Sequence, residues 1–365
     1  MKTKACIITA SRSEYGLLRW VMETIKSDSC FELQIIATGA HLSPEYGLTY
    51  REIEKDGFKI DAKVEMLISA DTATGVAKSM GLCAIGMSDA LVRLAPDFIV
   101  VLGDRYELLP VCSTALVMRI PIVHISGGDV TEGAIDNEIR NAVSQMASLH
   151  FPGTEESAKR LEKMGIARDR IVVVGEPGLD ALRKMPVLSR SDISEQLGLN
   201  ISDKWILLTY HPETRKKPEE NLAVLKVLVQ ELLEGTSAQI VATYAKADEG
   251  GRMINAYLEE ISNKAGTRFK VIKSLGQQMY LSLMKESAMI AGNSSSGIVE
   301  ASLLGVPVLN IGDRQKGRHL CSNIVSCSYT KQEINKAISS LAKNGFPQHE
   351  PDYYHGDGHA GERIA

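Results

Sequence analysis

The sequence predicts an α/β protein made of two doubly wound, Rossmann-like domains, and three observations lead to this fold class. The chain has 365 residues, enough for two domains of ~150 residues each. Short runs of Ile, Val and Leu alternate with longer segments of helical periodicity, which is typical of a parallel sheet covered by helices. The alternation stops once, at 176–200, where prolines and serines indicate an interdomain connection, and then starts again.

The first series of elements is expected before this connection. Its predicted strands are Ala5–Ala10, Glu32–Thr38, Phe98–Leu102, Pro121–Ile125 and Ile171–Val174. Its predicted helices are Gly16–Lys26, Thr74–Leu94, Glu107–Met118 and Glu155–Met164. Nearly continuous apolar residues in the strands indicate burial on both faces of a sheet.

The second series repeats the pattern. Its predicted strands are Trp205–Thr209, Gln239–Thr243, Lys270–Ile272, Met289–Ala291 and Val306–Asn310. Its predicted helices are Pro218–Leu233, Arg252–Lys264, Gln277–Lys285, Ile298–Leu304 and Gln332–Lys343. We expect the domains to face each other, with a ligand outside the carboxyl ends of their strands.

Composition narrows the function classes. Lys plus Arg number 41 against 45 Asp plus Glu, a net charge of −4 that argues against a nucleic-acid binder. Six cysteines without a C-x-x-C pair suggest reduced thiols in a cytoplasmic protein. The N-terminal apolar stretch is too short for a signal peptide, and no run approaches the ~20 apolar residues of a membrane span.

Two C-terminal patterns are weak signals. Gly356, Gly358 and Gly361 form a G-x-G-x-x-G, but no strand precedes it and no βαβ unit can follow, so the dinucleotide interpretation fails. Histidines at 349, 355 and 359 lie in a glycine-rich tail, which is more often a loop than a metal site. We therefore expect no cofactor and no metal.

The strongest anion-binding signal is the stretch 292–297, which follows a buried strand and opens a predicted helix. Ser294, Ser295, Ser296 and Gly297 would let backbone N–H groups and hydroxyls approach a phosphate at the helix N-terminus. The alternative is an ordinary N-cap with spare serines. Glu300, one turn further on, would accept ribose hydroxyls or merely complement the helix dipole.

Polar residues also lie within or directly after other predicted strands, in both halves of the chain. They are Ser11-Arg12-Ser13, Gly103-Asp104-Arg105, His124, His211-Pro212-Glu213 and Asp313-Arg314. Singly, each is an ordinary loop residue, but together they indicate a polar, anionic ligand in the cleft. The stretch after His124 adds Asp129, Asp136 and Arg140. Asp136 and Arg140 are four residues apart on one helix face, either as a surface pair or as acid and base groups of the site.

These motifs together resemble the hydrolysing UDP-N-acetylglucosamine 2-epimerases, including bacterial sialic-acid pathway enzymes. The likeness runs in order through the whole chain: SRSEYG, ATGAHLSPEYG, VVLGDRYE, HISGGDVTEGAID, TYHPET, GNSSSGIVEAS and NIGDRQKGR. The family implies a fold like that of two-domain nucleotide-sugar glycosyltransferases, with UDP held mainly by the second domain. On this basis we expect domains at 1–176 and 177–345, and a segment 346–365 that returns towards the first.

The resemblance also implies roles for single residues. Asp104, Asp136 and His211 match catalytic positions, and Asp129 lies where relatives often carry an acid. Arg105 and Arg140 match phosphate or sugar contacts. The residues that match the UDP-binding set are Arg12, Ser294, Ser295, Glu300 and Arg314.

Two departures from the family's motifs leave the identity of the substrate's sugar undecided. Some relatives carry a Glu where this chain has Ser126, and we expect Asp129 to supply that charge. Relatives usually read RH-x-x-TK after the catalytic Asp, whereas this chain has Arg140-Asn141 and then Ser144-Gln145. Relatives on the legionaminic-acid route, which act on a UDP-linked 2,4-diacetamido-2,4,6-trideoxy sugar, share the overall pattern.

The implied reaction is elimination of UDP across C1–C2, followed by hydration with inversion at C2. Asp104, Asp129 and Asp136 would divide the acid and base roles, in an order that the sequence leaves open. A glycosyltransferase of the same fold is the second hypothesis, and a non-catalytic nucleotide-sugar sensor the third. We expect a UDP-sugar as the partner, no nucleic acid or membrane, and a homodimer or homotetramer.

Overall fold

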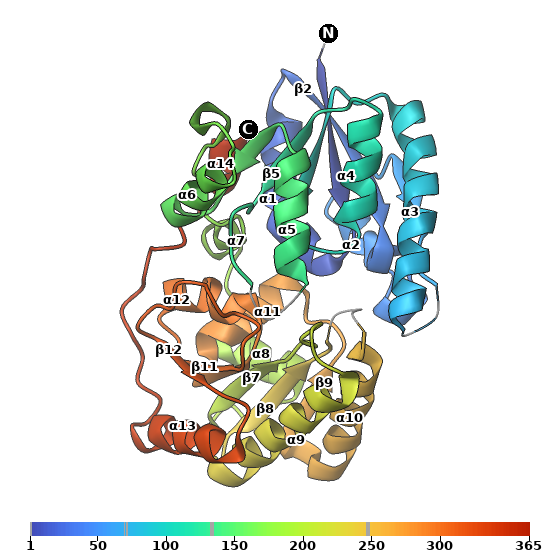
Figure 1. Cartoon of the computed structure of the whole chain (residues 1–365). Helices are drawn as coiled ribbons and strands as arrows, with labels where there is room; N and C mark the ends of the chain where they lie inside the picture. The colour runs from blue at the N-terminus through green and yellow to red at the C-terminus, as the bar shows by residue number, and fades with distance from the viewer. Residues whose placement is uncertain (1, 69, 71, 132–134, 246–248) are drawn as a thin grey trace. The chain divides into compact units, whose positions relative to one another are not determined.

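The computed structural model describes residues 2–365 except 69, 71, 132–134 and 246–248. The chain forms two compact units, each built around its own sheet (Figure 1). The first unit comprises Met1–Asp129, Ile135–Arg183 and His355–Ala365. The second comprises Val130–Ala134 and Lys184–Tyr354.

The first unit contains a parallel sheet with the strand order β3-β2-β1-β4-β5-β6. Its strands are β1 (Thr3–Thr9), β2 (Phe31–Thr38), β3 (Ala62–Val64), β4 (Phe98–Leu102), β5 (Ile122–Ile125) and β6 (Leu149–Phe151). Its helices are α1 (Arg12–Ser27), α2 (Tyr50–Lys55), α3 (Ala73–Leu94), α4 (Leu108–Val117), α5 (Asp136–Met146), α6 (Glu155–Lys163), α7 (Gly178–Lys184) and α14 (Ala360–Ile364). Short 3₁₀ turns lie at Gly39–Leu42, Pro44–Tyr46 and Arg168–Arg170.

Helices cover both faces of this sheet because alternate strand residues point to opposite sides. Cys6 and Ile8 of β1 pack with α3, α4 and α5. Ala5 and Ile7 pack with α1, α2 and the C-terminal α14. Asp180 of α7 fixes that C-terminal tail, since its carboxylate accepts hydrogen bonds from two backbone N–H groups of α14, each at 2.8 Å.

The second unit repeats the arrangement, with the parallel strand order β12-β11-β10-β7-β8-β9. Its strands are β7 (Trp205–Thr209), β8 (Gln239–Thr243), β9 (Phe269–Ile272), β10 (Met289–Gly292), β11 (Val308–Ile311) and β12 (Ile324–Cys327). Its helices are α8 (Arg190–Leu197), α9 (Pro218–Gly235), α10 (Gly251–Ala265), α11 (Gly276–Glu286), α12 (Glu300–Leu304) and α13 (Lys331–Lys343), with 3₁₀ turns at Gly266–Arg268 and Ser295–Gly297.

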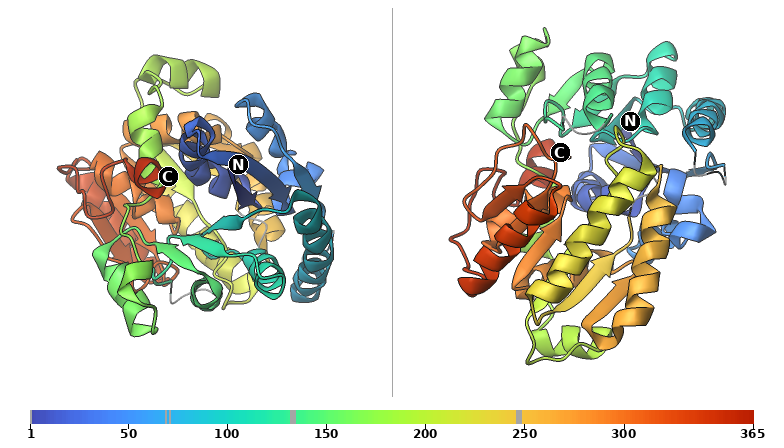
Figure 2. Two further views of the ribbon diagram at one scale, coloured as in Figure 1. Left: turned by 90° about the horizontal axis from the view of Figure 1, so that it is seen from above. Right: turned by 60° about the horizontal axis from the view of Figure 1, so that its bottom comes forward.

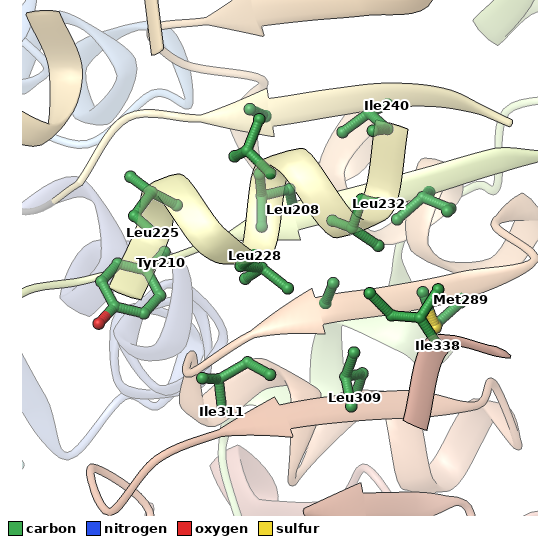
Figure 3. Packing of buried hydrophobic residues seen from close by; sticks show 14 of the residues in the cluster. Leu208, Tyr210, Leu225, Leu228, Leu232, Ile240, Met289, Leu309, Ile311 and Ile338 are labelled. Carbon is green, nitrogen blue, oxygen red and sulfur yellow. The ribbon is translucent and has the colours of Figure 1, made fainter. Parts of the chain in front are cut away.

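The core of the second unit also has two layers. Ile206 and Leu208 of β7 pack against α9, α10 and α13 (Figure 3), whereas Trp205 and Leu207 pack against α8, α11 and α12. Figure 2, right, shows α9 and α10 lying across the first of these faces. The predicted doubly wound fold class is therefore confirmed.

Edge strands account for the main differences from the predicted elements. β3, β6 and β12 lie at sheet edges and were not predicted, because they are short and carry polar residues. The predicted strand Ile171–Val174 is wrong, since only Ile171 forms an isolated bridge, to His150. Pro152 follows β6 and has no backbone N–H to continue that ladder. The predicted helix Ile298–Leu304 begins only at Glu300.

One helix among the described residues, α3, is long and apolar enough to cross a membrane when judged by length and composition alone. In the structure, α3 is one of the helices that cover the first sheet. Cys83, Met87 and Leu91 point from it into the core, as expected of an amphipathic covering helix.

Candidate active site

The strand orders fix where each unit can bind a ligand. In a doubly wound sheet, ligands bind at the carboxyl ends of the two strands between which the order reverses. In the first sheet these strands are β1, followed by Arg12, and β4, followed by Asp104. In the second they are β7, followed by His211, and β10, followed by the serine stretch 294–296. Each unit thus carries predicted site residues at its own switch point.

Arg140 links two loops of the first unit. Its guanidinium forms an ion pair with the Asp104 carboxylate, and its Nη1 donates to the Asp129 carbonyl oxygen at 2.9 Å. The arginine is 1% exposed and the Asp104 side chain 20% exposed. Arg140 is therefore not a surface residue, and it fixes the position of an Asp104 side chain that solvent can still reach.

Asp129 and Asp136 are connected to Asp104 through Arg140, which binds the Asp129 backbone and lies on the same helix as Asp136. The Asp129 carboxylate accepts a hydrogen bond of 2.6 Å from Ser157 Oγ, and Ser157 lies in the first turn of α6. Asp136 is the first residue of α5 and is partly exposed. Residues 132–134, between the two aspartates, lie outside the described part of the chain. The structure supplies defined partners for Asp129, while the roles of both residues stay predictions.

His124, a residue of β5, contacts the loop that carries Asp104. Its Nε2 lies 2.8 Å from the Gly103 carbonyl oxygen, so Nε2 carries the proton and donates it. Its Nδ1 lies 3.1 Å from Ser144 Oγ, which donates in turn. Burial lowers the pKa of His124 to about 4, and the ring is neutral near pH 7. The imidazole thus fixes the position of the Gly103 carbonyl group, which directly precedes Asp104 in the chain.

Arg105 and Arg12 occupy different surroundings. Arg105 is buried and makes a two-pronged ion pair with Glu107, at 2.7 and 3.0 Å. Arg12 is partly exposed in the first turn of α1, at the end of β1. Arg12 therefore lies where a phosphate would meet a helix N-terminus. Arg105, by contrast, stabilises the loop that carries Asp104, because it pairs with Glu107.

A carboxylate that the sequence did not single out lies at the ends of β5 and β6. Ser126 Oγ donates to Glu176 Oε2 at 3.0 Å. Glu176 is far from Ser126 in the chain, and nothing in the sequence pattern pairs them. Ser126, which stands where some relatives carry a glutamate, thus has the Glu176 carboxylate beside it in space.

Asn293 organises the switch point of the second unit. Its side-chain amide brackets His211, because Oδ1 accepts from the His211 N–H at 2.8 Å and Nδ2 donates to the His211 carbonyl oxygen at 2.9 Å. Its own carbonyl oxygen accepts from Arg314 Nη1 and Gln315 Nε2, at 3.2 and 2.9 Å. The loops after β7, β10 and β11 therefore meet at one buried asparagine. Gly292 permits this meeting, since a Cβ there would lie 2.0 Å from the Thr209 carbonyl oxygen.

The serine stretch forms a 3₁₀ turn in which all three serine side chains are partly exposed. Ser296 Oγ hydrogen-bonds to Tyr280 Oη at 2.7 Å and to Ser294 Oγ at 2.9 Å. Tyr280 also contacts Thr209 Oγ1 at 3.2 Å, so a chain of hydroxyls ties the turn to β7. Burial raises the pKa of the neighbouring Glu300, which begins α12. Phosphate binding at this turn stays a prediction.

A second polar cluster joins the loops that carry His211 and Arg314. Tyr329 Oη donates to Glu213 Oε2 at 2.8 Å and accepts from the Asp313 N–H at 2.7 Å. Lys216 completes the cluster, with its Nζ 3.2 Å from Glu213 Oε2. Sequence reasoning missed Tyr329, Tyr280 and Glu176 because strand-end position is a strong signal, whereas these residues reach the site from other elements.

Comparisons with known proteins find relatives over nearly the whole chain. A family model described as UDP-N-acetylglucosamine 2-epimerase matches residues 23–365. A GDP/UDP-N,N'-diacetylbacillosamine 2-epimerase (hydrolyzing) of Campylobacter jejuni is 42% identical over 347 residues, 95% of this chain and 89% of the relative. A UDP-N,N'-diacetylbacillosamine 2-epimerase (hydrolyzing) of Legionella pneumophila is 30% identical over 364 residues, 100% of this chain and 95% of the relative.

Solved structures share the fold. The UDP-GlcNAc 2-epimerase of Neisseria meningitidis, bound to UDP-GlcNAc, matches with a TM-score of 0.82 at 18% identity and covers 99% of this chain and 98% of its own. The UDP-GlcNAc 2-epimerase of Methanocaldococcus jannaschii, in complex with UDP-GlcNAc and UDP, matches with a TM-score of 0.81 at 21% identity. The match covers 99% of this chain and 98% of that enzyme's chain. The resemblance predicted from sequence and the two-domain, glycosyltransferase-like fold are both confirmed. The chain belongs to the UDP-N-acetylglucosamine 2-epimerase family.

Proposed function

We propose that this protein is a hydrolysing 2-epimerase of a UDP-linked 2-acetamido sugar, and that its preferred substrate is the UDP-2,4-diacetamido-2,4,6-trideoxy sugar. The observation that carries the reaction type is the Asp104 carboxylate held at a switch point by a buried arginine. The choice of sugar is supported by the two relatives at 42% and 30% identity, which are named for N,N'-diacetylbacillosamine. UDP-N-acetylglucosamine is the second candidate substrate.

The proposed reaction has two stages. A base removes the proton from C2, the C1–O bond to the diphosphate breaks, and UDP leaves with the formation of a C1=C2 double bond. Water then adds to this glycal, with the hydroxyl at C1 and a proton delivered to C2 from the opposite face. The sum is UDP-sugar plus water giving UDP plus the free 2-epimerised sugar.

The first unit has the groups for the proton transfers. Asp104 is paired with Arg140 and is still partly exposed, so we assign it as the base that removes the C2 proton. Asp136 and Asp129 are the proposed acids for the return of a proton. Carboxylates in different surroundings can divide acid and base roles in this way, because their surroundings separate their pKa values.

The second unit has the groups for the nucleotide. We assign the diphosphate to Ser294, Ser295, Ser296 and the Gly297 backbone, with Arg314 and His211 beside them. Hydrogen-bond donors and an arginine stabilise the negative charge that develops on the leaving diphosphate. Glu300 is assigned to ribose hydroxyls. In this scheme Arg12 of the first unit belongs to the UDP-binding set, and Arg105 and Arg140 position the sugar side.

The setting of the enzyme is also part of the proposal. We place it in the cytoplasm, in the synthesis of nonulosonic acids such as legionaminic or sialic acid. A homodimer or homotetramer is supported by large apolar side chains exposed on α3 and α4, namely Leu82, Ile85, Val92, Leu116 and Val117. No cofactor takes part in the scheme.

The deciding experiment runs the reaction in heavy water with the UDP-2,4-diacetamido sugar or UDP-N-acetylglucosamine and no acceptor. We expect UDP and a free sugar with inverted C2 and deuterium at C2, read by proton NMR. A glycosyltransferase acting as a slow hydrolase would release a sugar that keeps its C2 hydrogen and configuration. A non-hydrolysing epimerase would exchange C2 but leave the sugar on UDP. Either of these results would refute the proposed function.

A further inference from the structure

Ser126 stands in an unusual backbone conformation at the carboxyl end of β5. Its φ of 58° lies in the left-handed region that only glycine adopts without strain. Its N–H donates to the Phe151 carbonyl oxygen at 2.9 Å, which fixes it to the end of β6. Strained residues of this kind persist only where the surrounding structure holds them, and they gather at functional sites. Ser126 therefore has a geometry that the rest of the unit imposes.

The hydroxyl of Ser126 is directed at a carboxylate. Ser126 Oγ donates to Glu176 Oε2 at 3.0 Å. The other oxygen, Oε1, lies over Gly153, where a Cβ would come within 1.8 Å of it. The Glu176 N–H donates to the His355 carbonyl oxygen at 2.8 Å, so the backbone is fixed as well. Both ends of this glutamate are thus held by neighbours from distant parts of the chain.

The location of this carboxylate matters for the reaction. Ser126 follows β5 and Gly153 follows β6, and β5 is the neighbour of β4, which leads to Asp104. Adjacent strands lie about 4.8 Å apart, so the Glu176 carboxylate stands only one or two strand spacings from the Asp104 loop. It therefore belongs to the sugar side of the first unit. A carboxylate would repel the diphosphate, which leaves the neutral sugar as its partner.

We propose that Glu176, presented by Ser126, is a specificity-determining residue that accepts a hydrogen bond from an N–H or O–H group of the substrate's sugar. A carboxylate can accept several hydrogen bonds at once, and one of those that Glu176 accepts comes from Ser126. This inference rests on the proposed function, since it assigns the sugar to the first unit.

The test is Glu176→Gln, which keeps the shape and the contact with Ser126 but removes the charge. We expect the KM for the UDP-sugar to rise at least tenfold while kcat stays within threefold, because the lost contact serves ground state and transition state alike. The affinity for UDP alone should not change. Glu32→Gln, at an exposed position at the opposite, amino end of the same sheet, is the matched control and should leave both constants unchanged.

Gly153→Ala provides an independent perturbation. The φ of Gly153 lies outside the left-handed region, so alanine suits the backbone there, and the three atoms nearest to its Cβ all belong to the Glu176 side chain. We expect the same rise in KM, and no further rise when Gly153→Ala is combined with Glu176→Gln. Additive effects of the two changes, or a fall in kcat with an unchanged KM, would overturn the assignment.

A binding measurement separates this inference from the proposed function. Calorimetric titration with the intact UDP-sugar and with UDP is made in an Asp104→Asn background, in which turnover is expected to be slow. If Glu176→Gln lowers the affinity for the UDP-sugar but not for UDP, the inference stands even where the heavy-water experiment refutes epimerisation. Equal affinities for the UDP-sugar with and without Glu176→Gln, in a protein that turns the sugar over, would refute the inference alone.

Discussion

Acidification should destabilise the first unit through a buried histidine, His150 of β6. The side chain has no exposed surface, and its ring nitrogens make no well-formed hydrogen bond among the described residues. Burial, and then the nearby charge of Arg170, lower the pKa of His150 to about 4. In the unfolded chain the pKa of a histidine is about 6.5. Its contribution to stability is therefore complete above pH 6.5 and is lost as the pH falls towards 4.

The magnitude follows from these two pKa values. Between pH 8 and pH 5 the unfolded chain takes up a proton that the folded chain refuses, which lowers the free energy of unfolding by about 2 kcal/mol. His150→Leu abolishes this titration and removes a ring whose nitrogens make no well-formed hydrogen bond to the described part of the chain. Between pH 8 and pH 5, the free energy of unfolding of the wild type should therefore fall by about 2 kcal/mol more than that of the variant.

His124→Leu is the matched control. The pKa of His124 is lowered by burial to about 4 as well, but its ring holds the Gly103 carbonyl oxygen and Ser144. This variant should show the same flatter pH dependence and, in addition, a loss of about 1–3 kcal/mol at pH 8 from buried groups left without a partner.

Urea unfolding followed by tryptophan fluorescence can resolve the first unit. The chain has two tryptophans, Trp20 in the first unit and Trp205 in the second. In a Trp205→Phe background the signal reports on Trp20 alone. Unfolding curves at pH 5, 6, 7 and 8 would refute the reasoning if His150→Leu and its parent lost stability in parallel between pH 8 and pH 5.

Three further predictions concern the site. Ser294→Ala combined with Ser295→Ala should weaken UDP binding at least tenfold in a calorimetric titration, since a charged hydrogen bond contributes about 1.5–3 kcal/mol. Asp104→Asn and Asp136→Asn should each lower turnover about 100-fold, with much smaller effects on UDP affinity. Arg140→Met should cost about 3–5 kcal/mol in urea unfolding, because it leaves the Asp104 carboxylate without its buried partner.

Each of these predictions has its own contradicting result. Unchanged UDP affinity in the double serine variant would place the phosphates elsewhere. Near-normal turnover of either aspartate variant would remove that residue from the chemistry and make Asp129 the next candidate. A loss below about 1 kcal/mol for Arg140→Met would mean that water replaces the arginine at Asp104.

The central strands of both sheets could be predicted because burial on both faces leaves continuous apolar runs. Phe98–Leu102, Trp205–Thr209 and Gln239–Thr243 were predicted to the residue. Edge strands such as β3 and β12 give no such run, because one side of an edge strand meets solvent or a loop. Their pairing depends on the neighbouring strand and not on their own sequence.

The same distinction applies to the site. Residues that directly follow a central strand, such as Asp104 and His211, could be predicted from strand-end position. Supports that reach the site from another element could not, and Tyr329 and Glu176 are examples. Arg140 was singled out by its spacing from Asp136, yet the partner that the structure shows is Asp104, far away in the chain. Such pairings exist only once the sheet has brought separate loops together.

The two switch points share one physical device. In the first unit, the buried Arg140 binds the Asp104 side chain and the Asp129 backbone. In the second, the buried Asn293 binds both backbone groups of His211 and receives Arg314. In each case one buried polar residue joins loops that follow different strands, so removing it breaks hydrogen bonds to several groups at once. The loops that carry the proposed catalytic and binding side chains are therefore positioned together. A substitution of Arg140 or of Asn293 should displace two loops at once.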